Sequence, residues 1–250
     1  MQKVGIAFVL VLAACAGEPQ GPAGDPATGA IDALIAARRF RAALAEVDSR
    51  LVPAPGDVVL LDRRVRVLRE LGLEHQACAA ALELRRIAPS DARFAYEAGE
   101  LAAYLGETAA AHEQFAAARA LDPADWRPAV GEAALLLAEK SPRLAEAEAL
   151  LKPWVDGPGA RVEARFHHAL VVEAKGDAQG ALAVFERALE LDPRHVASLC
   201  NAARLAEAAG ERPRALDLLR RASSTVALDD EPLHRELERR IAALAAPPPR

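Results

Sequence analysis

GDAQGALAVFERALELDPRH, residues 176–195, is the stretch of sequence that decides the fold. Its apolar residues are spaced three and four positions apart, which places them on one face of a helix. They are Ala181, Leu182, Phe185, Ala188 and Leu189. Pro193 disfavours helical geometry in the residue before it and so ends this helix. Gly176 can adopt the left-handed backbone that commonly closes the preceding helix. The stretch therefore predicts the second half of a helix–turn–helix unit.

The same unit recurs along the chain at a nearly constant interval. The prolines of this series are Pro55, Pro89, Pro123, Pro158 and Pro193. The turn glycines are Gly72, Gly106, Gly176 and Gly210. The alanines are Ala43, Ala77, Ala111, Ala147, Ala181 and Ala215. A fixed period of about 34 residues is the sequence pattern of a stacked repeat protein. It predicts six units, at roughly 24–57, 58–91, 92–125, 126–160, 161–195 and 196–229.

Small alanines, an aromatic residue in the second helix and a late proline make the sequence resemble the tetratricopeptide repeat family. The matching residues include Gly99, Ala111, Phe115, Ala118 and Pro123 in the third unit, and Ala181, Phe185, Ala188 and Pro193 in the fifth. The match is weaker in the first unit, which lacks a turn glycine, and in the second, where Ala81 replaces the aromatic residue. In the fourth unit, Ser141 and Pro142 replace the glycine turn, and Lys152-Pro153-Trp154 gives the second helix an unusual end.

This resemblance implies an all-α fold, a right-handed superhelical solenoid of about six repeats over residues 28–229. Residues 230–246 are amphipathic and are expected to form a helix that caps the apolar end of the last repeat. The tail at 247–250 is expected to be disordered.

Composition excludes several other classes of protein. The chain of 250 residues is 52% hydrophobic but only 4% aromatic, which favours closely packed helices over β architectures. Charged residues make up 27%, too many for a polytopic membrane protein. The net charge of −5 offers no basic surface for nucleic acid.

The N-terminal segment is typical of an exported protein. Residues 1–14, MQKVGIAFVLVLAA, have the charge and the short apolar run of a signal peptide. Leu12-Ala13-Ala14-Cys15 resembles the bacterial lipobox, which implies that the Cys15 thiol is acylated. The alternatives are an ordinary secretory signal with an incidental cysteine, or an N-terminal membrane helix.

The residues after Cys15 indicate which membrane would hold a lipidated chain. Ala16 follows the cysteine, and the resemblance to lipoproteins then implies the periplasmic face of the bacterial outer membrane. Residues 15–27 are rich in glycine and proline and are expected to form a flexible tether.

No motif for catalysis stands out in the sequence. Phosphate-binding loops, nucleophile elbows and zinc helices are absent, so we expect no enzyme, no catalytic residue, no cofactor, no metal and no small-molecule substrate. Cys78 and Cys200 lie four repeats apart, and we expect them to be small helix residues rather than a disulfide.

The resemblance implies a protein-binding groove lined by the first helix of each repeat. The family's contact positions fall on Asp62, Arg66, Arg69, Arg93, Tyr96, Glu100, Phe166 and Arg204. Arg66, Arg69 and Arg93 are either a solvated helix face or a basic groove that accepts an acidic segment, because guanidinium groups pair with carboxylates. Phe166 is either a groove residue or part of the core.

The expected function is a non-catalytic, lipid-anchored scaffold for protein–protein interaction in an envelope complex of the pilus or secretion type. The chain resembles the pilotin and tight-adherence repeat lipoproteins, although the pilotin family's Asn-Asn-Tyr-Gly is replaced by Leu199-Cys200-Asn201-Ala202. The alternatives are an adaptor of outer-membrane protein assembly and a recruiter or regulator of a cell-wall enzyme. The partner would be a protein or peptide segment in the groove, and the membrane would be contacted through the N-terminal lipid.

Overall fold

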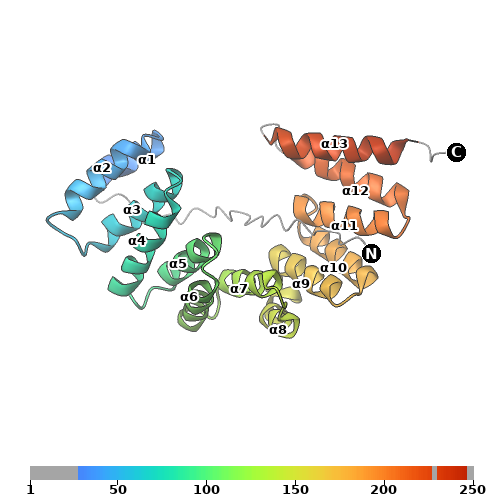
Figure 1. The fold of residues 1–250 in the computed structure, drawn as a ribbon, viewed down its shortest axis with the longest axis horizontal. Helices are drawn as coiled ribbons and strands as arrows, with labels where there is room; N and C mark the ends of the chain where they lie inside the picture. The colour runs from blue at the N-terminus through green and yellow to red at the C-terminus, as the bar shows by residue number, and fades with distance from the viewer. Residues whose placement is uncertain (1–27, 227–229, 247–250) are drawn as a thin grey trace. The chain divides into compact units, whose positions relative to one another are not determined.

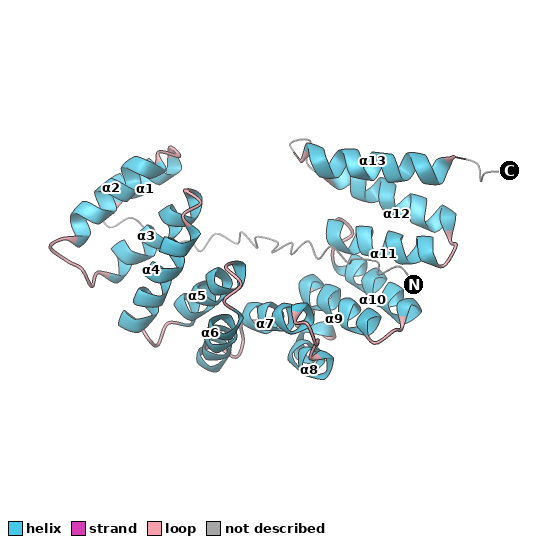
Figure 2. Cartoon of the chain, viewed as in Figure 1, coloured by secondary structure: helices cyan, strands magenta, loops and turns pink. Residues whose placement is uncertain are grey.

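The computed structural model describes residues 28–226 and 230–246, and these residues form thirteen α-helices and no strand (Figures 1 and 2). The helices are α1 (Gly29–Ala36), α2 (Phe40–Leu51), α3 (Val58–Glu70), α4 (Glu74–Ile87), α5 (Ala92–Tyr104), α6 (Thr108–Leu121), α7 (Arg127–Ala138), α8 (Leu144–Val155), α9 (Val162–Ala174), α10 (Ala178–Leu191), α11 (Val196–Ala208), α12 (Arg212–Thr225) and α13 (Glu231–Ala245). Helices that follow one another in the chain pack together, so the all-α solenoid of helix–turn–helix repeats expected from the sequence is confirmed.

The chain divides into two compact units. The described part of the N-terminal unit covers residues 28–135, and the C-terminal unit begins at Leu136, inside α7. Each unit has its own apolar core. The core of the C-terminal unit is built around Phe185 and Leu199, and the N-terminal unit has clusters around Phe115 and around Ile31.

The periodic alanines lie where helices meet most closely. Ala43, Ala77, Ala111, Ala147, Ala181 and Ala215 are all fully buried, with 0% exposure. Each lies in the second helix of its repeat. A methyl group allows two helix backbones to approach where a larger side chain would hold them apart. The low aromatic content therefore follows from the packing of the repeats.

Phe115 shows how one large ring is accommodated among small residues. It lies on α6, it is 1% exposed, and it faces two glycines on the helices to either side. A methyl group added to Gly99 of α5 would lie 2.8 Å from the Phe115 ring, and one added to Gly131 of α7 would also lie 2.8 Å from it. Both distances are shorter than van der Waals contact. The ring therefore fills a slot that depends on both glycines.

The predicted glycine turns are also confirmed. Gly72, Gly106, Gly176 and Gly210 join the two helices of their repeats with positive φ angles of 68°, 75°, 93° and 78°. In the first repeat the equivalent position, one period before Gly72, holds Arg38 with φ of 55°. L-residues with a side chain are disfavoured there, so the first turn carries a strain that the glycine turns avoid.

The fourth repeat departs from the pattern, as its sequence indicated. The α7–α8 turn has no left-handed glycine and is held by a hydrogen bond of 3.2 Å from the Arg143 amide to the Leu136 carbonyl. Pro153 lies within α8, which continues to Val155. After this helix, the Arg161 amide donates to the Trp154 carbonyl at 2.9 Å.

Helix α13 covers the end of the C-terminal unit. Leu237 is 1% exposed, and Leu233, Ile241 and Leu244 pack against the same core. Residues on the outer side, including Arg235 and Arg239, are exposed. One apolar face and one charged face are what a terminal helix needs in order to end a repeat stack in water.

Replacing Phe185 with alanine should lower the free energy of unfolding by about 3–5 kcal/mol, because the fully buried ring leaves a cavity. Chemical denaturation followed by circular dichroism measures the change. Phe185→Leu keeps much of the apolar volume and should cost markedly less. Equal losses in the two variants, or no loss in either, would contradict the packing described for this ring.

Candidate protein-binding face

The first helices of the N-terminal unit present most of the side chains that the family pattern marks for partner binding. Asp57 fixes the start of α3, because its carboxylate accepts hydrogen bonds from the Val59 and Leu60 amides at 2.9 and 3.0 Å. Asp91 does the same for α5 by accepting from the Arg93 amide at 3.0 Å. The surface that these two helices share is called the α3–α5 face here and carries Asp62, Arg66, Arg69, Arg93, Tyr96, Glu97 and Glu100.

Arg69 connects the two helices electrostatically. Its guanidinium lies 3.5 Å from the Glu97 carboxylate and 3.9 Å from that of Glu100. These contacts run from α3 to α5 and bring together two of the predicted site residues, Arg69 and Glu100. The Arg69 charge is thus shared between two carboxylates of the neighbouring repeat.

Tyr96 lies beside this ion-pair group and is held on three sides. Its hydroxyl donates a hydrogen bond of 2.6 Å to Glu100, and its ring lies 6.0 Å from that of Phe115. The Arg127 guanidinium lies 5.1 Å from the centre of the Tyr96 ring, within the range of a cation–π contact. Arg127 is itself oriented by Asp125 through paired contacts of 2.9 and 2.7 Å. The ring is therefore positioned before any partner arrives.

The remaining basic residues of the face differ in how they are paired. Arg93 folds back on Asp91 with contacts of 3.1 and 2.6 Å, and this hydrogen bonding lowers the pKa of Asp91. Asp62 pairs with its neighbour Arg63 at 2.9 Å. Arg66 is exposed. The face is mixed in charge, because the carboxylates of Asp62, Glu97 and Glu100 lie on it together with the arginines.

Glu97 is the residue of this face that the family pattern missed. Burial raises its pKa to about 7, and Asp62 and Glu100 add to the rise while Arg69 opposes it. Glu97 stands one period before Gly131, and Ala81 stands one period before Phe115. Where Phe115 of the third repeat meets a glycine of the fourth, the corresponding positions one period earlier hold Ala81 in the second repeat and Glu97 in the third. The absence of the aromatic at Ala81 was the clue available in the sequence.

The other two predicted groove residues belong to the C-terminal unit. Arg204 on α11 is ion-paired with Glu173 on α9 at 2.6 Å. A second contact of the same kind joins Arg240 on α13 to Glu207 on α11 at 2.6 Å. The first ion pair joins the first helices of adjacent repeats, as the Arg69 contacts do in the N-terminal unit. The second joins the first helix of the last repeat to the terminal helix α13.

Phe166 is a core residue as much as a surface residue. It is half-buried, and its ring lies 5.7 Å from Phe185 and 5.4 Å from His195. His195 also begins α11, where its ring nitrogen Nδ1 accepts from the Ser198 amide at 3.3 Å. Burial lowers the pKa of His195, and it lowers that of neighbouring His167 to about 4. These neutral rings help to close the core beneath Phe166.

Several expectations concern residues that lie elsewhere. Cys15, the predicted lipidation site, lies outside the described residues. Cys78 is a buried free cysteine on α4, and Cys200 is a half-buried one on α11. Within residues 28–226 and 230–246, no cluster of three or more histidine, cysteine or acidic side chains could hold a metal ion. None of the helices in these ranges is both long and apolar enough to cross a bilayer.

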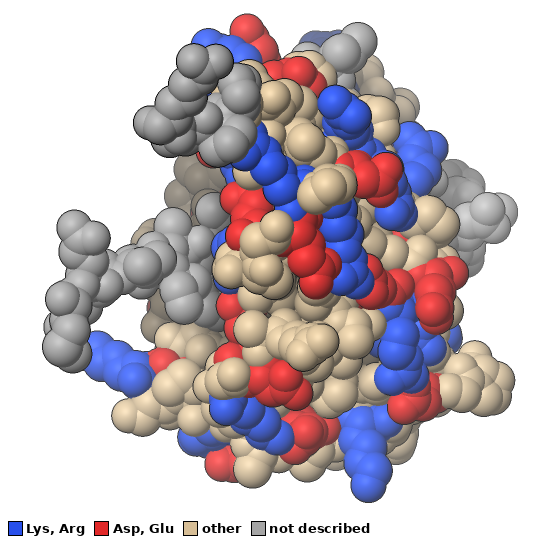
Figure 3. Space-filling view, turned by 90° about the vertical axis from the view of Figure 1, so that its right-hand side faces the viewer, with Lys and Arg blue, Asp and Glu red and all other residues tan. Residues whose placement is uncertain are grey.

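Charged side chains of both signs are also mixed on the one face of the molecule that Figure 3 draws. Figure 3 shows lysine and arginine interspersed with aspartate and glutamate on the face turned to the viewer. Neither sign dominates there. The visible surface is therefore suited to contacts specified by individual pairs more than to attraction by a uniform field.

The family comparison agrees with the repeats read from the sequence. A tetratricopeptide repeat model matches residues 173–241. No curated protein sequence matches the chain.

Solved structures of similar fold include a tetratricopeptide repeat protein from Parabacteroides merdae ATCC 43184. It is 13% identical with a TM-score of 0.69, and the match covers 89% of this chain and 93% of that one. PilW, a type IV pilus biogenesis factor, is 18% identical with a TM-score of 0.65 and coverage of 79% and 91%. YrrB, a tetratricopeptide repeat protein with an unusual peptide-binding site, is 19% identical with a TM-score of 0.51 and coverage of 77% and 97%. At these identities the likeness establishes the fold.

Replacing Glu97 with glutamine should change how stability depends on pH. Glu97 has a pKa of about 7 in the folded chain against 4.5 for a free glutamate, so between these values the folded state holds a proton that the unfolded state has lost. Native stability therefore falls as pH rises through this window. Glu97→Gln removes that loss and should gain roughly 1–3 kcal/mol relative to the native chain between pH 5 and pH 8.

Urea denaturation at the two pH values measures this difference. Glu70→Gln, at an exposed glutamate on α3, is the matched control. Glu70→Gln keeps Glu97 and should therefore keep the pH dependence of the native chain. A gain in stability between pH 5 and pH 8 of equal size in the Glu70 variant would contradict the assignment to Glu97.

Proposed function

We propose that this protein is a non-catalytic, lipid-anchored scaffold that binds other proteins during assembly of a bacterial envelope complex of the pilus or secretion type. In this proposal Cys15 carries the lipid at the periplasmic face of the outer membrane, and the repeats hold a partner segment. The α3–α5 face is the contact surface in the N-terminal unit.

The observation that carries the binding role is the fixed Tyr96 on a face of mixed charge. Its ring is held by Phe115 and Arg127, and its hydroxyl by Glu100, so little side-chain freedom remains to be lost on binding. Tyrosine and arginine are also the side chains most often found at the centre of protein interfaces. A face of this kind suits an extended segment with both apolar and charged side chains.

The likeness to PilW supports the assembly role by analogy of fold. The peptide-binding site named for YrrB supports the groove in the same way. The lipobox-like Leu12-Ala13-Ala14-Cys15 supports the anchor, since acylation of a cysteine needs that residue at the cleavage point.

Cys15→Ser should release the protein from membranes, because the serine hydroxyl cannot replace the thiol that receives the lipid. Detergent phase partitioning of the expressed protein measures this. Cys200→Ser, at the half-buried cysteine on α11, should leave partitioning as it is in the native chain. Unchanged detergent partitioning of the Cys15 variant would refute the anchor.

Replacing Arg66 and Arg93 with glutamate should lower the affinity for the partner about tenfold, because two attractive charges at the interface become repulsive. Quantitative co-purification from cell envelopes identifies the partner and measures the loss. Reversal of Arg235 and Arg239 on the outer side of α13 is the control, since both are exposed and lie in the other unit. Equal recovery of every co-purified protein in both variants would exclude the α3–α5 face as the binding surface.

A further inference from the structure

Helices α1 and α2 and the turn between them, residues 29–51, carry four arginines and three carboxylates. All three carboxylates of α1 and α2 are already held by arginines. The pairs are Asp32 with Arg63 at 2.7 Å, Glu46 with Arg50 at 2.7 Å and Asp48 with Arg64 at 2.8 Å. Three further arginines of the repeat, Arg38, Arg39 and Arg41, are exposed at the turn between the two helices.

These three arginines have no competing partner among the described residues. In that part of the chain, none of their side chains makes an ion pair or a hydrogen bond. They are adjacent in the sequence, interrupted only by Phe40, which packs on the core of the first repeat. Three exposed guanidinium groups within four residues of sequence attract anions.

The backbone at Arg38 provides a second, independent observation. Its φ of 55° is left-handed, and four other repeats place glycine at the corresponding turn. Glycine would form this turn without strain, so the arginine is present despite a conformational cost. An outlier of this kind points to a role for the side chain itself.

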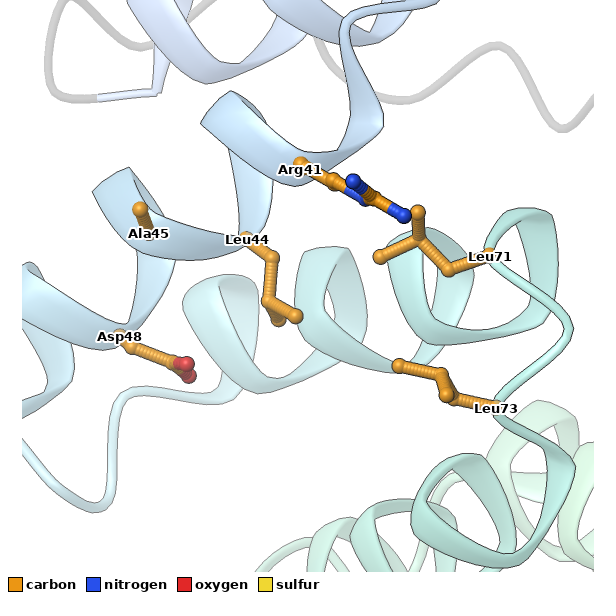
Figure 4. Close-up of a pocket in the computed structure, with 6 residues that line it drawn as sticks. All are labelled: Arg41, Leu44, Ala45, Asp48, Leu71 and Leu73. Carbon is orange, nitrogen blue, oxygen red and sulfur yellow. The ribbon is translucent and has the colours of Figure 1, made fainter.

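An apolar recess adjoins one of these arginines, Arg41. A pocket of about 360 Å³ is lined by Arg41, Leu44, Ala45, Asp48, Leu71 and Leu73. Figure 4 shows Arg41 and Leu44 of α2 directed toward Leu71 and Leu73 at the turn between α3 and α4. Leu73 is 37% exposed, and the carboxylate of Asp48 is occupied by Arg64. Cationic and apolar groups are thus presented side by side.

We infer that Arg38, Arg39 and Arg41 bind the phosphate groups of anionic phospholipids, with the adjoining recess against the apolar part of the membrane interface. Guanidinium groups pair with phosphate through two hydrogen bonds, and arginine combined with leucine suits the boundary between head groups and acyl chains.

A lipid surface is favoured over an acidic protein because of where the patch lies in the chain. The inference rests on the proposed function in this one respect: Arg38 follows Cys15 by 23 residues, so acylation at Cys15 would keep the patch close to the bilayer. A lipid chain joined to a basic patch is a two-part anchor that holds better than either alone.

The test is flotation of the full chain with Cys15→Ser on vesicles of equal parts phosphatidylglycerol and phosphatidylcholine, compared with phosphatidylcholine alone. Replacing Arg38, Arg39 and Arg41 with glutamine should lower the partition coefficient on the anionic vesicles about 100-fold, or about fivefold for each arginine. Glutamine at Arg220, Arg235 and Arg239 gives the same net charge and should have less than a twofold effect. Equal losses in the two triple variants, or no loss in either, would overturn the inference.

Arg38→Gly separates lipid binding from folding. It should raise the denaturation midpoint, because glycine relieves the left-handed strain, and still bind anionic vesicles about fivefold more weakly. Weaker binding together with a lower midpoint would show that the variant is merely unfolded, and Arg38→Gln would then decide the role of the charge. Full vesicle binding by the triple variant with loss of a co-purified acidic protein would assign the patch to a protein and overturn the lipid inference.

The outcome does not depend on acylation. Every vesicle measurement uses the Cys15→Ser chain, so a failed anchor would appear only in the partitioning of the native protein. A failed lipid patch would appear only in the difference between the two triple variants on anionic vesicles.

Discussion

Close approach of neighbouring helices is the constraint on which the structure depends. No helix of a repeat can bury its apolar face alone, so each must pack on the helices before and after it in the chain. Fully buried alanines such as Ala111 and Ala181 allow that approach, and Phe115 fits only because Gly99 and Gly131 leave room for its ring. Small residues therefore determine the positions of the helices, and the helices determine which side chains share a face.

Ion pairs between adjacent repeats follow from this spacing. Arg69 reaches Glu97 and Glu100, and Arg204 reaches Glu173, because first helices of consecutive repeats lie at the distance that long side chains can span. Such surface pairs contribute little to stability individually. Their larger effect is on recognition, since Glu97 and Glu100 beside Arg69 give the α3–α5 face a mixed charge.

In the first repeat, the three carboxylates of α1 and α2 are already occupied by arginines. The arginines at its turn are left without a partner in the described part of the chain, and one of them sits where glycine would be the less strained choice. The features of this repeat that depart from the family pattern are thus the ones that suggest a separate contact with the membrane, distinct from the α3–α5 face.

The sequence alone determined the repeat period, the helical class, the positions of the glycine turns and the apolar helix face that holds Phe185. These properties follow from local spacing and backbone chemistry, which a repeating pattern makes visible. The sequence could not determine the partners of Arg69 and Arg93, the raised pKa of Glu97 or the left-handed backbone at Arg38. Only the tertiary structure decided these, because charge pairing and burial depend on side chains brought together from different helices, and the period marks where each residue lies but not which neighbour it meets.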